Sequence, residues 1–200
     1  MDGINIIGTP EELPKAMNCL KKEFEMKDLG KTKLCLGLQI EHLDKEIFVH
    51  QEGYIEKVLK HLYMDKCHPL STPMVVRSLD VEKVPFRPRE NDEELLGPKV
   101  PYLSAIGALI YLANYTRPDI SFVVNLLVRY NFSPTLRYLN GVKHILCYLR
   151  GTIDISLFLT KVSRYELTDY ADASYLSDPH NGKSQIGYLF RCGNTVISWR

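Results

Sequence analysis

An apolar stretch in the middle of the chain, residues 102–152, constrains the fold most strongly. Its hydrophobic residues recur at helical spacing in three runs, which predicts three consecutive helices. Pro118 stands where the second helix would begin, and Ser133-Pro134 would open the third, since proline in a first turn loses no hydrogen bond. Gly151 would end the third helix. The expected buried faces comprise Leu103, Ile106, Leu109, Ile110 and Ala113; Ile120, Val123, Val124 and Leu127; and Leu136, Leu139, Val142, Ile145, Leu146 and Leu149.

The residues before this stretch predict short strands and two helices. Residues 4–8 are apolar and predict a strand, and Thr9-Pro10 predicts a helix start with a threonine cap. The apolar face of this first helix would be Leu13, Met17, Leu20 and Phe24, with Pro14 poorly suited to a position one turn inside it. Alternating polarity over 32–42, a turn near Asp44-Lys45 and a second run at 47–50 predict a hairpin. Residues 54–64 return to helical spacing.

Residues 65–101 have the composition of a connector. They hold six of the eleven prolines, which excludes a long helix or a central strand. We expect an extended arm that lies over other structure or is partly disordered.

The C-terminal part predicts a sheet. Residues 167–175, 183–192 and 195–199 are strand-like, with turn signals at Asn181-Gly182 and Gly193-Asn194 between them. Trp199, the single tryptophan, would lie in the core of this sheet. The predicted fold class is therefore α+β, and the sheet would keep an exposed edge that favours aggregation.

Composition indicates the class of the protein and its expected location in the cell. The 200 residues are 45% hydrophobic and 24% charged with a net charge of +1, as in an ordinary globular chain. Five scattered cysteines fit reduced thiols. Because no signal peptide or long apolar run is present, we expect an intracellular protein of the cytoplasm or nucleus that is neither secreted nor membrane-bound.

Five stretches in a fixed order carry a family resemblance. They are MKDLGKTKLCLGLQI (26–40), HPLSTPM (68–74), YLSAIGALIYLANYTRPDISFVVNLLVRY (102–130), VKHILCYLRGT (142–152) and YADASYLSDPHNGKSQIGYLFRCGNTVISW (170–199). Together they resemble the copia-type LTR retrotransposon Pol polyprotein, at the end of its reverse transcriptase and the start of its ribonuclease H. The resemblance implies that the chain is a truncated segment of an enzyme whose activities are RNA-directed DNA synthesis and cleavage of RNA–DNA hybrids.

The resemblance also implies a domain division. Residues 1–64 would be a palm remnant of β-hairpin and helix with the start of the thumb, and 65–101 the proline-rich connector. Residues 102–160 would be the helical thumb or connection. Residues 161–200 would be the N-terminal part of a ribonuclease H-like domain, with an incomplete sheet.

The polymerase chemistry of the family needs clustered carboxylates that hold two Mg²⁺ ions. The matching position here is Asp2, a palm metal ligand in the ancestral enzyme, while Gly3 replaces the second aspartate. The upstream palm carboxylate has no counterpart in these 200 residues. We therefore expect no polymerase activity from this chain by itself, and a solvated role for Asp2.

The ribonuclease H chemistry of the family also uses two metal ions. Tyr170 to Ser174 match the first-strand pattern, which places Asp172 on its first catalytic and metal-binding carboxylate. Asp169 and Asp178 do not match ligand positions. The other ligands would follow Trp199, so we expect no hybrid cleavage by this chain. Mg²⁺ belongs to the ancestral enzyme, and we expect no metal or small-molecule cofactor here.

A basic run lies between residues 129 and 164. In the ancestor it would grip a template–primer or RNA–DNA hybrid through phosphates, without reading sequence. The alternative is a solvated helix face. The basic residues are Arg129, Arg137, Lys143, Arg150, Lys161 and Arg164.

Other functions find weaker support in the sequence. A non-enzymatic module that binds nucleic acid or protein, retained from a retroelement, is the main alternative. Residues 137–140 approach the Arg-x-Leu-Arg signature of secreted effectors, but they differ at the last position and lie in an expected helix, so we discount that reading. His61, Cys67 and His68 match no zinc-site spacing.

Overall fold

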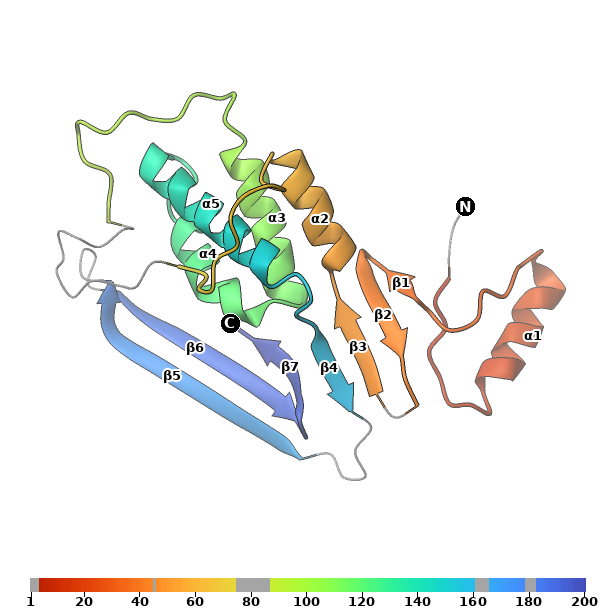
Figure 1. Ribbon diagram of the computed structural model, residues 1–200. Helices are drawn as coiled ribbons and strands as arrows, with labels where there is room; N and C mark the ends of the chain where they lie inside the picture. Colours follow the sequence, from red (N-terminus) through yellow and green to blue (C-terminus); the bar gives the residue numbers. More distant parts are fainter. Residues whose placement is uncertain (1–3, 45, 75–86, 161–165, 179–182) are drawn as a thin grey trace.

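Helices α2 to α5 lie together, and two antiparallel sheets run along one side of them (Figure 1). The computed structural model describes residues 4–44, 46–74, 87–160, 166–178 and 183–200. The helices are α1 (Leu13–Glu23), α2 (Glu52–His61), α3 (Tyr102–Tyr115), the 3-10 turn η2 (Pro118–Ile120), α4 (Ser121–Val128) and α5 (Leu136–Gly151). The strands are β1 (Leu34–Cys35), β2 (Leu38–His42), β3 (Glu46–His50), β4 (Leu157–Thr160), β5 (Leu167–Asp178), β6 (Lys183–Cys192) and β7 (Thr195–Trp199). This mixed architecture is compatible with the predicted α+β class.

The N-terminal segment differs from its prediction. Residues 4–8 form no strand, and the side chain of Ile7 is 97% exposed, since no described strand lies alongside to pair with them. Helix α1 begins at Leu13, later than the Thr9-Pro10 start that we predicted. This later start puts Pro14 in the first turn, where its missing N–H is harmless. No residue of α1 is buried, and the helix stands apart from the body (Figure 1).

The first sheet has the order β1-β2-β3-β4. The strand predicted over 32–42 is wrong in one respect, because a two-residue turn divides it into β1 and β2. Leu36 and Gly37 both have positive φ angles, 50° and 78°, as the tight turn between antiparallel strands requires. The hairpin of β2 and β3 is confirmed, with Ile40 opposite Val49.

Strand β4 was not predicted. It follows α5 and pairs antiparallel with β3, which brings the rings of Phe48 and Phe158 to 4.9 Å between centroids. The backbone N–H of Thr160 donates to the hydroxyl of Thr195 at 3.3 Å, so the end of β4 lies beside β7. Residues 153–160 thus leave the helical block and join the sheets.

The helical block forms the apolar core, and its three predicted helices are confirmed. Two predicted face positions are wrong: the side chains of Leu103 and Leu136 are 62% and 59% exposed. Each lies at the start of its helix, before the packed turns. Helix α5 begins two residues after Ser133-Pro134, and its last residue is Gly151 as predicted. The buried apolar residues on α2 to α5 are Ile55, Val58, Leu59, Tyr102, Ala105, Ile106, Leu109, Leu112, Ala113, Ile120, Val123, Val124, Leu126, Leu127, Tyr138, Val142, Ile145, Leu146, Tyr148 and Leu149.

A buried arginine fastens the ends of these helices. Arg117 is fully buried and forms an ion pair with Asp119 at 2.7 Å. Its other N–H groups donate to the carbonyl and hydroxyl oxygens of Thr152 at 3.0 and 2.7 Å. Tyr148 donates its hydroxyl proton to Asp119 at 2.7 Å. The cluster connects the loop before α4 to the end of α5, and it supplies the partners that a buried charge needs.

The described residues of the connector lie over other structure, as the predicted arm would. They contact α5 and the residues just before it. The N–H of Leu70 donates to the carbonyl of Cys147 at 3.2 Å, and that of Leu96 donates to Pro134 at 2.8 Å. Residues 75–86 lie outside the described part. Among the described residues, no helix is long and apolar enough to cross a lipid bilayer.

The second sheet has the order β5-β6-β7, and its strands are confirmed. Gly193 in the second predicted turn has a φ of 59°, which favours glycine, whereas Asn181-Gly182 lie outside the described residues. The indole N–H of Trp199 donates to the carbonyl of Ala113 at 2.7 Å. Trp199 thus joins the sheet to the end of α3 rather than lying in a sheet core.

Candidate nucleic-acid interface

Of the two carboxylates predicted as ancestral metal ligands, one lies in the described part of the chain. Asp172 lies exposed near the middle of β5, where its cross-strand partner is Gly187. Asp169 is exposed on the same strand, and Asp2 lies outside the described residues. No group of three or more His, Cys, Asp or Glu side chains in the described part of the chain could hold a metal ion. The described residues therefore do not fit the Mg²⁺ site of the ancestral enzymes.

Arg137, one of the predicted phosphate contacts, is engaged within the chain. Its guanidinium lies 2.5 Å from the Glu93 carboxylate, and the two side chains are only 20% and 23% exposed. Burial would raise the pKa of Glu93, but the hydrogen bond and charge of Arg137 outweigh it and hold that pKa below its usual value. The pair attaches the connector to the start of α5.

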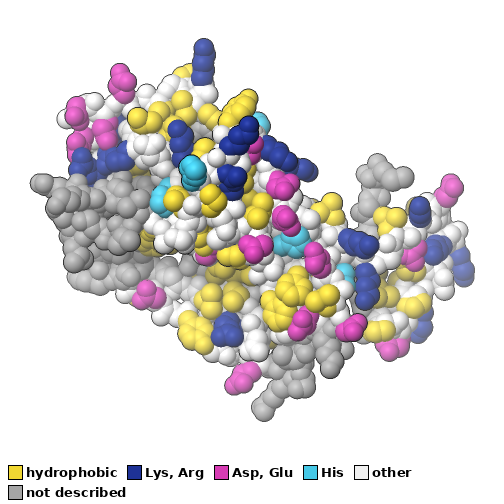
Figure 2. Space-filling model, viewed as in Figure 1, with side chains coloured by type: hydrophobic (Ala, Val, Ile, Leu, Met, Phe, Trp, Pro, Cys, Tyr) yellow, Lys and Arg dark blue, Asp and Glu magenta, His cyan; other side chains and the backbone are white. Residues whose placement is uncertain are grey.

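The other predicted contacts have mixed positions. The guanidinium of Arg150 donates to the carbonyl of Cys67, whereas Arg129 and Lys143 are exposed. Lys161 and Arg164 lie outside the described residues. Figure 2 shows Lys and Arg side chains over the helices dispersed among acidic and apolar ones. Of the described residues of the basic run, Arg137 and Arg150 therefore bind within the chain, and Arg129 and Lys143 lie on the surface.

A basic cavity that the sequence analysis missed lies between the β1–β2 hairpin and α2. Its volume is about 830 Å³. Exposed Lys31 and Lys33 precede β1, and Lys57 reaches it from α2. Among the residues that the structure describes, Glu41 is the one acidic residue of the lining. The lining comprises Lys31, Lys33, Leu34, Gly37, Gln39, Ile40, Glu41, His42, His50, Gly53, Tyr54 and Lys57.

The walls of this basic cavity are held by hydrogen bonds between the hairpin and the helices. The Gly53 N–H donates to the Gln39 side-chain oxygen at 2.7 Å, which fixes the start of α2 on β2. The Tyr111 hydroxyl donates to the carbonyl of Leu36 in the hairpin turn. A Cβ at Gly37 would lie 3.0 Å from that hydroxyl, so glycine permits the close approach as well as the positive φ.

The Glu41 carboxylate in this cavity faces a histidine. It lies 3.3 Å from the His50 ring, and Glu52 lies 4.0 Å from the other ring nitrogen. The three lysines form no ion pair within the described residues that would occupy their ammonium groups. The cavity is thus bordered by three exposed lysines, at a surface that a polyanion could approach.

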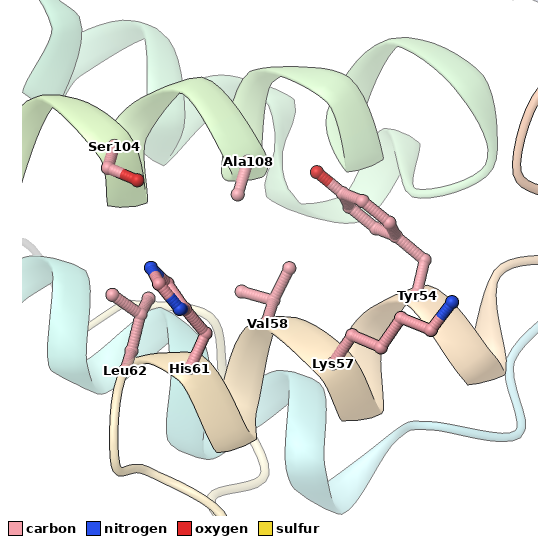
Figure 3. A pocket seen from close by; sticks show the side chains of 7 residues that line it. All are labelled: Tyr54, Lys57, Val58, His61, Leu62, Ser104 and Ala108. Carbon is pink, nitrogen blue, oxygen red and sulfur yellow. The ribbon is translucent and has the colours of Figure 1, made fainter.

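A second cavity of about 420 Å³ lies between α2 and α3 (Figure 3). Tyr54 and Lys57 line both cavities, which therefore adjoin. The Tyr54 ring meets the Tyr111 ring edge-on, with 4.9 Å between centroids. Burial, with a contribution from Tyr111, raises the pKa of the Tyr54 hydroxyl, which stays protonated near neutral pH. The second cavity is lined by Tyr54, Lys57, Val58, His61, Leu62, Ser104 and Ala108.

The missed site left only a weak signal in the sequence. Lys31 and Lys33 stand in the GKTK run, more than twenty residues before Lys57. They share a cavity because the chain turns twice, at 36–37 and between β2 and β3, before α2 begins. Without the first turn in the prediction, nothing indicated that these lysines lie together.

Comparison with curated proteins finds relatives that match all or much of the chain. A retrovirus-related Pol polyprotein from transposon TNT 1-94 of Nicotiana tabacum is 37% identical over 203 residues, which is 100% of this chain and 15% of that protein. An uncharacterized mitochondrial protein of Arabidopsis thaliana is 32% identical over 180 residues, 90% of this chain and 71% of its own length. A secreted RxLR effector protein of Plasmopara viticola is 37% identical over 101 residues, 50% of this chain and 71% of its own.

The chain thus spans about 15% of the length of the transposon polyprotein that it matches from end to end. No model of a protein family and no solved structure matches it.

Proposed function

The chain belongs to the Pol polyproteins of copia-type retrotransposons, and from this membership we propose that it joins the end of the reverse transcriptase to the start of the ribonuclease H. In this proposal β1 to β3 with α1 and α2 are the palm remnant and thumb start, and α3 to α5 are the thumb or connection. Strands β5 to β7 begin the ribonuclease H-like domain. The position of Asp172 in the first of three antiparallel strands supports that last assignment.

The function that the geometry supports best is binding of the sugar–phosphate backbone of a template–primer or RNA–DNA hybrid. The observation that carries it is the cavity that Lys31, Lys33 and Lys57 all line. Ammonium groups bind phosphates as point charges without reading the bases. This is the property that a protein needs when it must hold any sequence of its own template.

We further propose that these 200 residues have neither polymerase nor ribonuclease H activity by themselves. Gly3 stands at the second palm aspartate position of the resemblance, and no metal-holding carboxylate cluster exists among the described residues. Because the donor set does not fit the two ions that such chemistry uses, the chain would bind its nucleic acid without cleaving or extending it.

The test is binding of an RNA–DNA hybrid to the full chain across a salt series. A triple variant, Lys31→Gln, Lys33→Gln and Lys57→Gln, should bind more weakly. The slope of log affinity against log salt should become shallower by about 2 to 3, because each phosphate contact releases close to one counterion.

The matched control removes three exposed lysines of α1, by Lys15→Gln, Lys21→Gln and Lys22→Gln. It changes net charge equally and should leave the slope nearly unchanged. Equal losses in both triple variants would mean that only net charge matters. A wild-type chain that does not bind the hybrid at low salt would contradict the function itself.

The second candidate function is protein binding, by a non-enzymatic module that was retained from a retroelement. The relative named as a secreted effector, which matches half of the chain, favours considering it. A partner protein that competes with the hybrid for the wild-type chain but not for the lysine triple variant would support this candidate.

A further inference from the structure

The cavity between α2 and α3 has a shape and lining that the phosphate-binding proposal does not use. Tyr54, Val58 and His61 stand on one face of α2, at spacings of four and three residues. Ser104 and Ala108 stand one helical turn apart on α3, and in Figure 3 Ala108 faces Val58 across the cavity. Small side chains on α3 leave the space open, while larger ones on α2 form its walls.

Two ring side chains close the ends of this space. Tyr54 and His61 are seven residues apart on α2, or about 10 Å along its axis. Both rings line the cavity, with buried Val58 between them (Figure 3). A flat base in this space could stack on one of the two rings beside the aliphatic Val58 side chain, and stacking on aromatic side chains is how proteins hold a base removed from its stack.

The polar groups of the cavity suit a base with a phosphate attached. The hydroxyls of Tyr54 and Ser104 and the ring of His61 can exchange hydrogen bonds with base edges, and no acidic side chain of the described residues lines the space. Lys57 lies at its edge and also lines the basic cavity beside Lys31 and Lys33. Glu56, the neighbouring acid on α2, is paired with Lys60 at 3.8 Å.

These features lead to one inference, which rests on the proposed function. We propose that the α2–α3 cavity takes a single unpaired nucleobase of the bound strand, while Lys57 holds the adjoining phosphate. The ligand class is single-stranded nucleic acid or the unpaired end of a hybrid. A paired base keeps its edges and faces inside the duplex, so it cannot enter a space between two helices.

The experiment compares two single strands of equal length and charge, oligo(dA) and the same backbone with abasic sites, each bound to the full chain. The wild-type chain should prefer oligo(dA) by about 5- to 150-fold, the range expected when one base stacks on an aromatic ring. Equal affinity for the two strands would overturn the base slot and leave the phosphate-binding proposal standing. A wild-type chain that binds neither strand would overturn both.

Ala108→Leu should fill the cavity and reduce oligo(dA) binding to the level of the abasic strand. Gly107→Leu is the matched control, because a Cβ at Gly107 meets nothing within 4 Å. It adds the same side chain to the same helix, and the preference for oligo(dA) should persist. If Ala108→Leu keeps that preference while folded, the slot is not where the base binds.

A second pair of variants keeps the inference testable if Ala108→Leu does not fold. Tyr54→Leu removes the stacking ring without filling the cavity, and it should abolish the preference for oligo(dA). Tyr54→Phe keeps the ring and should retain most of that preference. Circular dichroism and the unfolding midpoint establish that each variant is folded, and equal preferences in the two Tyr54 variants would contradict the inference.

Discussion

The helical block and the C-terminal sheet were both predicted from their residue patterns, yet they bury their side chains very differently. Helices α3 to α5 contain most of the buried apolar core, with Leu109, Leu127 and Ile145 fully buried. Among the side chains described in β5 to β7, none of the apolar ones is buried, and Ile186 is 71% exposed. Strand periodicity therefore predicted where the strands lie without predicting that a face is covered.

The difference arises from what each region packs against. The three helices follow one another in the chain and bury their apolar faces against one another, and a buried, paired arginine connects the loop before α4 to the end of α5. The sheet meets them through a few contacts, such as the hydrogen bond from Trp199 to Ala113. This comparison predicts that stability depends on the helices and only weakly on the sheet.

The largest expected effect comes from Arg117→Leu. It leaves the Asp119 carboxylate without its cation, and breaking such a buried pair costs about 3–5 kcal/mol of unfolding free energy. Urea unfolding measures the loss. The double variant with Asp119→Leu should recover part of it, because no unpaired charge then remains; a double variant worse than the single one would contradict this explanation.

A matched truncation sharpens the comparison directly. Leu109→Ala in α3 should cost about 2–5 kcal/mol, since the side chain is fully buried and leaves a cavity. Ile186→Ala in β6 should change the unfolding free energy by less than about 0.5 kcal/mol, because the side chain is mostly exposed. Similar costs for the two variants would show that the sheet is as well packed as the helices.

Trp199→Phe tests the connection between the two regions. It removes one hydrogen bond to the Ala113 carbonyl and keeps an aromatic ring, so it should cost about 1 kcal/mol. Circular dichroism must follow unfolding, since Trp199 is the only tryptophan. A loss above that of Leu109→Ala would mean that the sheet supports the helices far more than its exposure indicates.

The smallest expected effect is the pH dependence of the unfolding free energy that arises from Asp119 in the helical block. Burial would raise the pKa of Asp119, but hydrogen bonding and charge from Arg117 lower it overall. A carboxyl with a depressed folded-state pKa stabilises the fold above its unfolded pKa and loses that contribution as pH falls through the folded value. Unfolding free energy should therefore fall in acid.

Asp119→Asn isolates this contribution. The variant should be less stable than the wild type at neutral pH, and the difference should narrow in acid as the wild-type carboxyl protonates. Unfolding midpoints at several pH values measure it. A difference in stability that stays constant with pH would show that protonation of Asp119 is not coupled to unfolding.

The sequence was informative wherever local pattern decides structure. The three mid-chain helices and strands β5 to β7 follow from periodicity and turn residues. The turn at Leu36-Gly37 was missed because Leu36, a non-glycine residue, takes a positive φ inside an alternating run. Strand β4 was missed because it is only four residues long and is defined by its pairing with β3.

The candidate site was harder to predict than the fold. Family resemblance directed attention to Asp172 and to the basic run, but Arg137 and Arg150 prove to be engaged with Glu93 and Cys67. Lys31, Lys33 and Lys57 line one cavity only because of the tertiary structure, which sequence spacing does not show.

Hydrogen–deuterium exchange of the full chain, with and without an RNA–DNA hybrid that has an unpaired end, tests the account most directly. Without the hybrid, amides of α3 and α5 should exchange more slowly than those of β5 and β6, since the core lies in the helices. With the hybrid, new protection should appear at 31–42 and along α2. New protection confined to β5 and β6, or none in the hairpin and α2, would contradict the central claim that the lysine cavity binds the nucleic acid.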